Sequence, residues 1–537
     1  MQNYSTISNE GSASAAGPGT SGDMTRHRRA HGRQKDGGGG GQATMISSVI
    51  NLLNTIVGAG TLAMPSAMSH FGLTLGIIAM LWSAFTSAFG LYLQSRCARY
   101  LDRGSSSFFA LSQMTYPNAA VIFDAAIAIK CFGVGVSYMI IIGDLMPGVV
   151  VGFDARAADI PYLVDRNFWI TVFMLVIIPL SFLRRLDSLK YTSIVALVAI
   201  GYLIVLVVYH FATDPLAPRE KVKLVTWGGP VEALASLPVV IFAYTCHQNM
   251  FSILNEIRDY TPMSIMGVIS SSIGSAAGIY VLVGITGYLT FGDDVTGNIV
   301  SMYPPSIAST IGKAAIVVLV TFSIPLQVHP CRASVDAVLK WRPNAGSISQ
   351  MRANSPGSRP LLSSTARSDH ANAPMSDARF AFLTTIILVL AYMTALTVSS
   401  LERVLAYVGS TGSTSISFIL PGLFYYKISD PDSIHQQRLT KEDDDALSPN
   451  ASDSEDADDN EGLLGASVAS IRSAASGASS TRNKPKSPWR WRMKWRWDME
   501  HINPNHLRRA ALALSIYGVC VMVVCLTMNV VGTYSTH

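Results

Sequence analysis

The chain of 537 residues is 49% hydrophobic and only 14% charged, with a formal net charge of +5, whereas an ordinary soluble protein carries about 25% charged residues. Its 42 glycines, 25 prolines and 6 cysteines, with a mean hydropathy of +0.33, exclude a collagen-like, a disulfide-rich and a wholly disordered chain. We therefore expect an integral membrane protein.

Three polar segments divide the chain. Residues 1–43 are rich in Gly, Ser, Arg and His, residues 341–378 in Ser, Arg, Ala and Pro, and residues 428–507 pass from an acidic run to a basic, Trp-rich one. Because such segments cannot bury enough apolar surface to offset the entropy of ordering the chain, they are predicted to be disordered and cytosolic. The predicted membrane parts are residues 44–340 with helices 1–8, 379–427 with helices 9 and 10, and 508–537 with helix 11 and a short lumenal tail.

Eleven apolar segments are predicted to cross the membrane. Each is close to the roughly 20 residues that cross the hydrocarbon core of a bilayer as a helix. The predicted spans are residues 45–68, 72–95, 119–150, 167–183, 190–211, 231–256, 264–290, 306–339, 380–399, 403–427 and 508–532.

Lysine and arginine are distributed unevenly around these spans. Loops rich in them are retained in the cytosol, so the side with more of them is expected to be cytosolic. With a cytosolic N-terminus, 31 of the 40 basic residues fall on the cytosolic side and 7 on the other, while Lys130 and Arg332 lie within spans. The short loops 96–117 and 184–189, compared with 152–166 and 291–305, agree. A cytosolic N-terminus is therefore predicted.

The first predicted span, NLLNTIVGAGTLAMP from Asn51 to Pro65, contains small residues about halfway along. Gly58 and Gly60 each lower helix stability by roughly 1 kcal/mol relative to alanine, and Thr61 can cap a new helix start. We expect a broken helix, which at membrane depth marks a polar site. The N–H groups and positive dipole end of the new helix suit a carboxylate. A close helix contact through small residues is the alternative.

The sixth predicted span, LPVVIFAYTCHQNMFSILNE from Leu237 to Glu256, is also interrupted. Its middle residues, 245–249, have few apolar side chains, which is costly at bilayer depth unless they face a cavity. Broken helices at matching positions of two halves are typical of inverted-repeat transporters with a midplane site. The predicted fold is therefore an all-α membrane protein of eleven transmembrane helices, with a 5+5 inverted repeat, broken helices 1 and 6, and one extra C-terminal helix.

The motif from Asn51 to Pro65 and the stretch FAYTCHQNMFSILNE from Phe242 to Glu256 resemble the amino acid/auxin permease family, specifically its fungal vacuolar amino acid transporters. The resemblance covers roughly residues 44–430 and the last span. It implies eleven helices and proton-coupled movement of amino acids across the vacuolar membrane. The long segments 341–378 and 428–507 depart from the family pattern.

The resemblance also implies roles for individual residues. The substrate carboxylate would meet backbone in the first span, and the amino group would meet carbonyls at the break in the sixth. The substrate-binding residues expected on this basis are Asn51, Gly58, Ala59, Gly60, Thr61, Ala243, Tyr244 and Thr245. In sodium-coupled relatives an ion is held by groups matching Asn54 with Thr321 or Ser323, although a polar contact between helices would place the same residue types there.

Ionisable residues within spans are functional candidates by default. His247 lies in the predicted break of the sixth span, and free histidine has a pKa of about 6.5, between cytosolic and vacuolar acidity. It is expected either to carry or gate the coupling proton or to be a neutral, hydrogen-bonded ring. Lys130 lies deep in the third span and should have a partner that the sequence does not identify.

The leading functional prediction is secondary active amino acid transport across the vacuolar membrane. The alternatives are an amino acid sensor that uses the same site to signal, and a sodium-coupled transporter at another membrane. Without a GxSxG, HExxH, P-loop or GxGxxG motif in a suitable context, an enzyme is not expected, nor is a cofactor. All six cysteines lie in or beside spans without metal-ligand spacing, so neither disulfides nor a metal are expected.

The expected partners are an amino acid, a proton or sodium ion, and membrane lipid. Residues 489–497, WRWRMKWRW, precede the last span, where Trp suits headgroup depth and Arg and Lys attract anionic lipid. Interfacial anchoring is therefore favoured there over binding of nucleic acid.

Overall fold

The computed structural model describes residues 41–183, 192–340, 375–433 and 504–535, apart from residues 42, 102–103, 105 and 227, together with residue 437. The segments predicted to be disordered, 1–43, 341–378 and 428–507, lie almost wholly outside the described residues, and so does the Trp-rich stretch 489–497.

The described part of the chain is helical, apart from turns and one isolated parallel bridge between Ala43 and Ile257. The predicted all-α class is therefore confirmed. In chain order the longer helices are α1 Met45–Ile56, α2 Ala59–Phe71, α3 Leu73–Ala98, α4 Phe108–Thr115, α5 Ala120–Phe153, α7 Arg166–Ser181, α8 Thr192–Thr213, α9 Pro230–Ala243, α10 His247–Glu256, α11 Pro262–Phe291, α13 Ile307–Lys340, α15 Asp377–Thr397, α16 Leu401–Val408, α17 Leu420–Ile428 and α19 Pro504–Ser535. Two four-residue helices, α6 Pro161–Val164 and α12 Ile299–Met302, lie in loops.

Within the described residues, eight helical segments are long and apolar enough to cross a membrane, with α9 and α10 counted together as one, and the bent pair α1 and α2 is a ninth candidate. The two remaining predicted spans, residues 167–183 and 403–427, are also helical. α7 has only 16 residues, and two π-helical segments, Gly409–Ser413 and Ser415–Ile419, separate α16 from α17. Every predicted span thus contains helix, whereas the number of eleven crossings and the inverted repeat stay predictions.

Local sequence accounts for several helix boundaries. The Thr44 side chain accepts a hydrogen bond from the Ser47 N–H at the start of α1, and the Asp165 carboxylate caps the start of α7. Gly72, between α2 and α3, has a φ of 75°, and a Cβ there would lie 2.2 Å from the Thr226 carbonyl oxygen. Because L side chains disfavour positive φ, glycine permits the short turn that folds α3 back beside α2.

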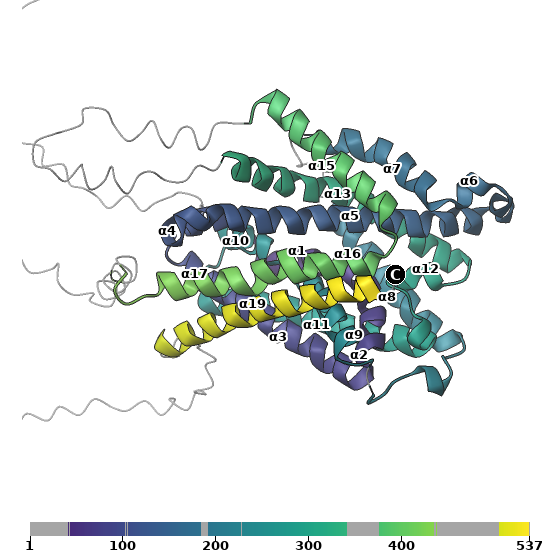
Figure 1. The fold of residues 1–537 in the computed structure, drawn as a ribbon, viewed down its shortest axis with the longest axis horizontal. Helices are drawn as coiled ribbons and strands as arrows, with labels where there is room; N and C mark the ends of the chain where they lie inside the picture. The colour runs from purple at the N-terminus through teal and green to yellow at the C-terminus, as the bar shows by residue number, and fades with distance from the viewer. Residues whose placement is uncertain are drawn as a thin grey trace, which may run out of the picture. The chain divides into compact units, whose positions relative to one another are not determined.

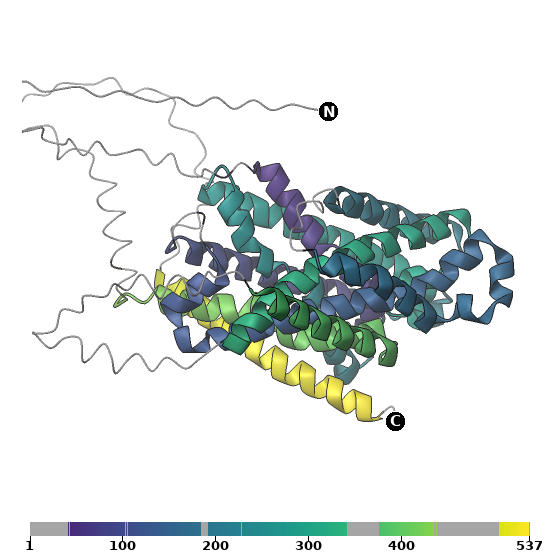
Figure 2. The ribbon, with the colours of Figure 1, turned by 90° about the horizontal axis from the view of Figure 1, so that it is seen from above.

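The long helices run between the two ends of a bundle (Figure 1). We call the end at the left of Figure 1 the near end: α10, α13 and α17 finish there, and α15 and α19 begin there. The far end holds α6, α12 and the last residues of α19. Figure 2 shows the same helices from above, with α1 tilted across the others. The loops predicted to lie across the membrane, 152–166 and 291–305, are therefore at the opposite end from the helix ends that flank 341–378.

Large apolar side chains cover the outside of the bundle. Ile78 is 57% exposed, Phe85 63% and Leu175 69%. Such exposure is unfavourable in water but suits contact with lipid tails. Polar groups that are buried between helices thus stand out as candidates for function.

Candidate functional site

The second half of the first span is capped three residues before the residue that the sequence predicted as its cap. α1 ends at Ile56 and α2 begins at Ala59, with a bend of 55° between them. The N-cap residue is Gly58, so the expectation that Thr61 caps the second helix is wrong. Thr61 lies inside α2, where its N–H donates to the Gly58 carbonyl over 3.0 Å. The first N–H groups of α2 still lack helical partners, as at any helix start.

The two glycines of this motif have different neighbours. A Cβ added at Gly58 would meet only the Tyr138 hydroxyl, at 3.6 Å, whereas one at Gly60 would lie 2.6 Å from the Ala243 Cβ. Gly60 is therefore needed for the close approach of α2 to α9. Gly60 thus forms the close helix contact that was the alternative explanation of the motif, and Gly58 lies at the predicted break, whose role in binding a carboxylate stays a prediction.

The sixth span is interrupted between Ala243, the last residue of α9, and His247, the first of α10. The Thr245 hydroxyl donates to the Ile241 carbonyl over 2.9 Å. On the other side of the break, the Gln94 side chain of α3 donates to the His247 carbonyl over 2.9 Å. Hydrogen bonds thus hold both margins of the break, which lies in the polar run that the sequence identified.

Tyr280 of α11 links the two breaks. Its fully buried hydroxyl lies 2.7 Å from the Ile56 carbonyl oxygen, at the end of α1, and 2.9 Å from the Ala243 carbonyl oxygen, at the end of α9. Carbonyls at the ends of helices lack intrahelical donors and are costly to bury unpaired. One hydroxyl therefore holds the interrupted backbones together.

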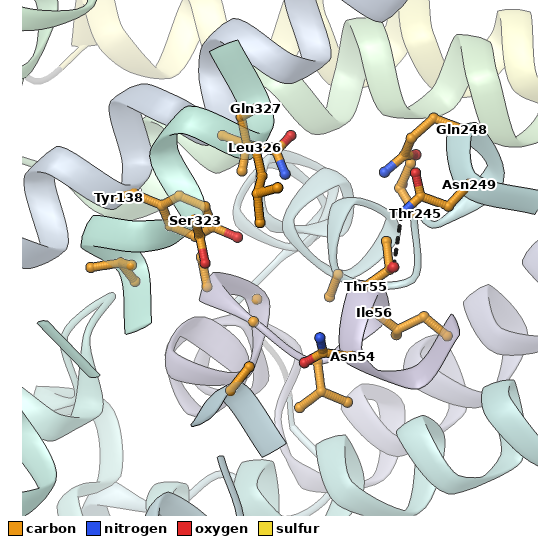
Figure 3. A pocket seen from close by; sticks show the side chains of 18 of the residues that line it. Asn54, Thr55, Ile56, Tyr138, Thr245, Gln248, Asn249, Ser323, Leu326 and Gln327 are labelled. Atoms are coloured by element: carbon orange, nitrogen blue, oxygen red, sulfur yellow. Dashed lines mark hydrogen bonds between the residues drawn. The ribbon is translucent and has the colours of Figure 1, made fainter. Parts of the chain in front are cut away.

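A central cavity of about 800 Å³ lies between these breaks. Helices α1, α2, α5, α8, α9, α10 and α13 contribute to its wall. Figure 3 shows side chains of its polar wall, including Asn54, Thr245 and Ser323. The structure brings eight of the twelve predicted site residues to this cavity, namely Asn51, Asn54, Gly58, Ala59, Gly60, Ala243, Thr245 and Ser323.

The other four, Thr61, Tyr244, His247 and Thr321, are buried away from the cavity wall. The Tyr244 ring packs edge-on against Tyr280, with centroids 5.0 Å apart. Nε2 of His247 lies 3.2 Å from the Ser87 carbonyl oxygen of α3. Among the described residues, no carboxylate oxygen lies within ion-pair distance of that ring.

The predicted ion-binding residues are only partly assembled. Asn54 and Ser323 share the cavity wall, and the buried Oδ1 of Asn54 has no hydrogen-bond partner within the described residues. The hydroxyls of Thr321 and Ser323 donate to carbonyls of their own helix, Val317 over 2.6 Å and Leu319 over 2.8 Å. Their oxygens remain able to accept one further contact.

Several cavity residues were absent from the predicted site. The Asn249 side chain donates to the Thr55 hydroxyl over 2.9 Å and so joins α10 to α1 (Figure 3). Gln248 could have been found from the polar run 245–249. Tyr280, which joins the two breaks but is absent from the cavity wall, could not have been found, since it lies in an apolar helix without a local signal. Lys130, whose partner was left open, also lies on the cavity wall.

The cavity reaches the near end of the bundle. Its lining includes Glu256, the exposed last residue of α10, and the exposed residues Asn51 of α1 and Ser252 of α10. The helices that enclose the break on the other side are packed closely, and Met64 and Ala63 of α2 are fully buried. The cavity is therefore accessible from the near end, while the far side is closed.

A polar group that we call the far-end cluster, Ser66, His70, Ser236 and Glu402, joins α2, α9 and α16. Ser66 donates to one oxygen of the Glu402 carboxylate over 2.8 Å, and Ser236 donates to the other over 3.2 Å. Nδ1 of His70 lies 3.0 Å from the Ser236 hydroxyl and 3.5 Å from the carboxylate. These contacts hold both interrupted spans against α16 beyond the cavity.

The arrangement defines a class of protein. Unwound backbone at membrane depth is tolerated where it lines a cavity, and helix breaks that meet at such a cavity are characteristic of secondary transporters. The described residues contain no group of three or more His, Cys, Asp or Glu side chains that could hold a metal ion.

Comparison with known families agrees with this class. The family described as transmembrane amino acid transporter protein matches residues 41–445, and the chain therefore belongs to this family, the amino acid/auxin permease family. The family resemblance predicted from the two motifs is confirmed. Because the family consists of transporters, the prediction that the chain is not an enzyme is also confirmed.

Individual relatives are similar over most of their length. The chain is 45% identical to vacuolar amino acid transporter 5 of Schizosaccharomyces pombe, over 72% of this chain and 86% of that protein. It is 43% identical to vacuolar amino acid transporter 6 of Saccharomyces cerevisiae, over 72% and 90%. It is 26% identical to bovine sodium-coupled neutral amino acid transporter 7, over 57% and 67%. Among solved structures, the inward-facing conformation of Mhp1 matches with a TM-score of 0.47 and 11% identity, over 72% of this chain and 77% of Mhp1.

Proposed function

We propose that this chain is a secondary active transporter that moves amino acids across the vacuolar membrane by alternating access. The meeting of two interrupted spans at one cavity carries the proposal. The start of α2 presents N–H groups suited to the substrate carboxylate, and unwound carbonyls after Ala243 suit its amino group. The names of the fungal relatives support the substrate class and the membrane.

The proposed orientation has the near end in the cytosol. Both long segments with many basic residues, 341–378 and 428–507, adjoin helix ends that lie there. In the present conformation the cavity then faces the cytosol, and the far-end cluster closes the path to the vacuolar lumen. Transport requires this cluster to separate while the cytosolic side closes.

Proton coupling is the preferred mode because an acidic vacuole supplies the gradient. His247 is the proposed coupling residue, since it begins α10 directly after the break. Its ring does not line the cavity, so any protonation would act through the position of α10 relative to α3, where the ring meets the Ser87 carbonyl.

Sodium coupling is the second candidate. It is favoured by the unpartnered, buried Oδ1 of Asn54 beside Ser323 on the same cavity wall. Carbonyl, amide and hydroxyl oxygens are the ligands that hard cations take.

Uptake by the purified protein in liposomes tests these functions together. A panel of labelled amino acids is offered under an imposed proton gradient, with an uncoupler as control, and separately under a sodium gradient. Accumulation that the uncoupler abolishes supports the proposal. Accumulation driven by sodium alone supports the second candidate, and binding of amino acids without flux under either gradient would refute transport in favour of a sensor.

A further inference from the structure

Lys130 is a buried cation without a partner among the residues that the structure describes. It lies in the middle of α5, only 4% exposed, and its side chain forms part of the wall of the central cavity. Among the described residues, neither a carboxylate nor a carbonyl oxygen lies within bonding distance of its amine. A charged group at membrane depth is costly unless it is paired or hydrated.

The other two fully buried cations of the described chain do have partners. Lys313, 3% exposed, donates to the Tyr303 carbonyl over 2.9 Å. Arg332, 4% exposed, donates to the Thr384 hydroxyl over 2.9 Å, and its guanidinium lies 3.8 Å from the centre of the Phe380 ring. The protein therefore pairs its buried cations where they are structural, and Lys130 differs from them in facing the cavity.

The backbone of Lys130 is held in place. A Cβ added at Gly412, in the π-helical segment beside α5, would lie 2.9 Å from the Lys130 nitrogen and Cβ. This close packing leaves little freedom to move the lysine away from the cavity. Its side chain lies near Cys246, the residue before α10 at the break of the sixth span.

The surroundings of the amine favour an anion from the cavity. The only carboxylate among the described lining residues is that of Glu256, which is exposed at the near end. The start of α10, a helix of ten residues, lies between the cavity-lining residues Thr245 and Gln248 and adds the positive end of its dipole there. The start of α2 forms a separate positive end at the other break, where the proposed function puts the α-carboxylate of the substrate.

We propose that Lys130 binds a second anionic group of the substrate, so that the cavity prefers amino acids with a carboxylate side chain. This inference rests on the proposed function and specifies its substrate class. An acidic amino acid would place one carboxylate at the start of α2 and the other against the Lys130 amine. Its binding would also supply the counter-charge that the described residues do not provide.

Glutamate and glutamine separate this proposal from a structural role, because they differ in side-chain charge at nearly equal size. Binding is measured as the rise in unfolding temperature of the purified protein with each ligand, and flux as uptake into liposomes. The variants are Lys130→Gln and Lys130→Arg, with Lys313→Gln as the control that removes a buried but partnered lysine.

In the unsubstituted protein we expect glutamate to stabilise more than glutamine. Lys130→Gln should weaken glutamate binding about 10- to 150-fold, the range for a lost hydrogen bond between charged groups, and leave glutamine binding within about threefold. Lys130→Arg should restore part of the preference, and Lys313→Gln should leave it unchanged. Without ligand, Lys130→Gln should unfold at a temperature no lower than the parent, because it removes an unpaired charge, whereas Lys313→Gln should unfold earlier.

Equal losses for both ligands would overturn the proposal, since Lys130 would then serve the α-carboxylate or the fold. An unsubstituted protein that binds and carries glutamine but not glutamate would also overturn it, and that result would leave the transport function intact. Conversely, binding of glutamate that depends on Lys130, without any flux, would support the role of Lys130 and refute transport.

Discussion

Leucine substitutions at Gly58 and Gly60 add the same atoms two residues apart but should have different effects: the first should reduce transport, and the second should reduce stability. At Gly58 the first added carbon meets only the Tyr138 hydroxyl, at 3.6 Å, so the rest of the side chain extends into the cavity. At Gly60 the first added carbon would lie 2.6 Å from the Ala243 Cβ. Since carbon atoms pack at about 3.5–4.0 Å, α2 would have to move from α9 by about 1 Å.

The magnitudes follow from these contacts. Gly58→Leu blocks the N–H groups at the start of α2, and the loss of one hydrogen bond to a carboxylate, about 1.5–3 kcal/mol, lowers kcat/KM about 10- to 150-fold. Gly60→Leu overpacks the contact with α9, which costs about 1–3 kcal/mol or more. The gain of about 1 kcal/mol from replacing a helical glycine offsets this only in part.

The assay combines uptake into liposomes with the unfolding temperature of each variant in detergent. We expect Gly58→Leu to reach its membrane, to unfold near the parent temperature and to lose transport, with Gly58→Ala intermediate. Gly60→Leu should unfold at a clearly lower temperature. Normal uptake by Gly58→Leu would refute the assignment of the carboxylate to the start of α2, and equal loss of stability in both variants would refute the distinction between the glycines.

Three further predictions test other contacts. Tyr280→Phe removes the hydroxyl between the Ile56 and Ala243 carbonyls and should cost about 1–3 kcal/mol of stability, measured as a lower unfolding temperature. The control Tyr244→Phe removes a buried hydroxyl without a partner in the described chain and should cost far less. Similar losses in the two variants would contradict the bridging role of Tyr280. Glu402→Gln weakens the far-end cluster, so a cysteine introduced on the far side of α2 should become more accessible to a thiol reagent; unchanged labelling would show that the cluster does not hold the far side closed. His247→Gln keeps a donor for the Ser87 carbonyl but cannot take up a proton, and it should flatten the pH dependence of uptake with little change in KM, whereas an unaltered pH profile would assign His247 a purely structural role.

The breaks in the first and sixth spans could be predicted because their causes are local. Gly58 and Gly60 weaken helix wherever they stand, and the run 245–249 is polar within an apolar segment. The detailed roles within these breaks could not be predicted. The cap is Gly58 instead of Thr61, and Gly60 packs against Ala243, because those outcomes depend on α9 lying beside α2.

The residues of the candidate site were likewise predictable where the cause is local and unpredictable where it is tertiary packing. Eight predicted residues reach the cavity, because backbone next to a helix break has to be buried in protein or line a polar space. Thr321 does not reach it, although Ser323 two residues later does. Positions two apart lie on different faces of a helix, and the orientation of α13 is set by its neighbours, above all by α5 alongside it.

The sequence by itself determined that this is a helical membrane protein of the amino acid/auxin permease family, roughly where its helices lie, and that the first and sixth spans are interrupted, since hydropathy and helix propensity act over neighbouring residues. Only the tertiary structure decided which groups meet. Ser66 and Glu402 are 336 positions apart in the chain, and Tyr280 and Ile56 are 224 apart. The low overall charge likewise indicated lipid, but the position of Lys130 on the cavity wall, away from any carboxylate of the described residues, arises from packing between distant helices.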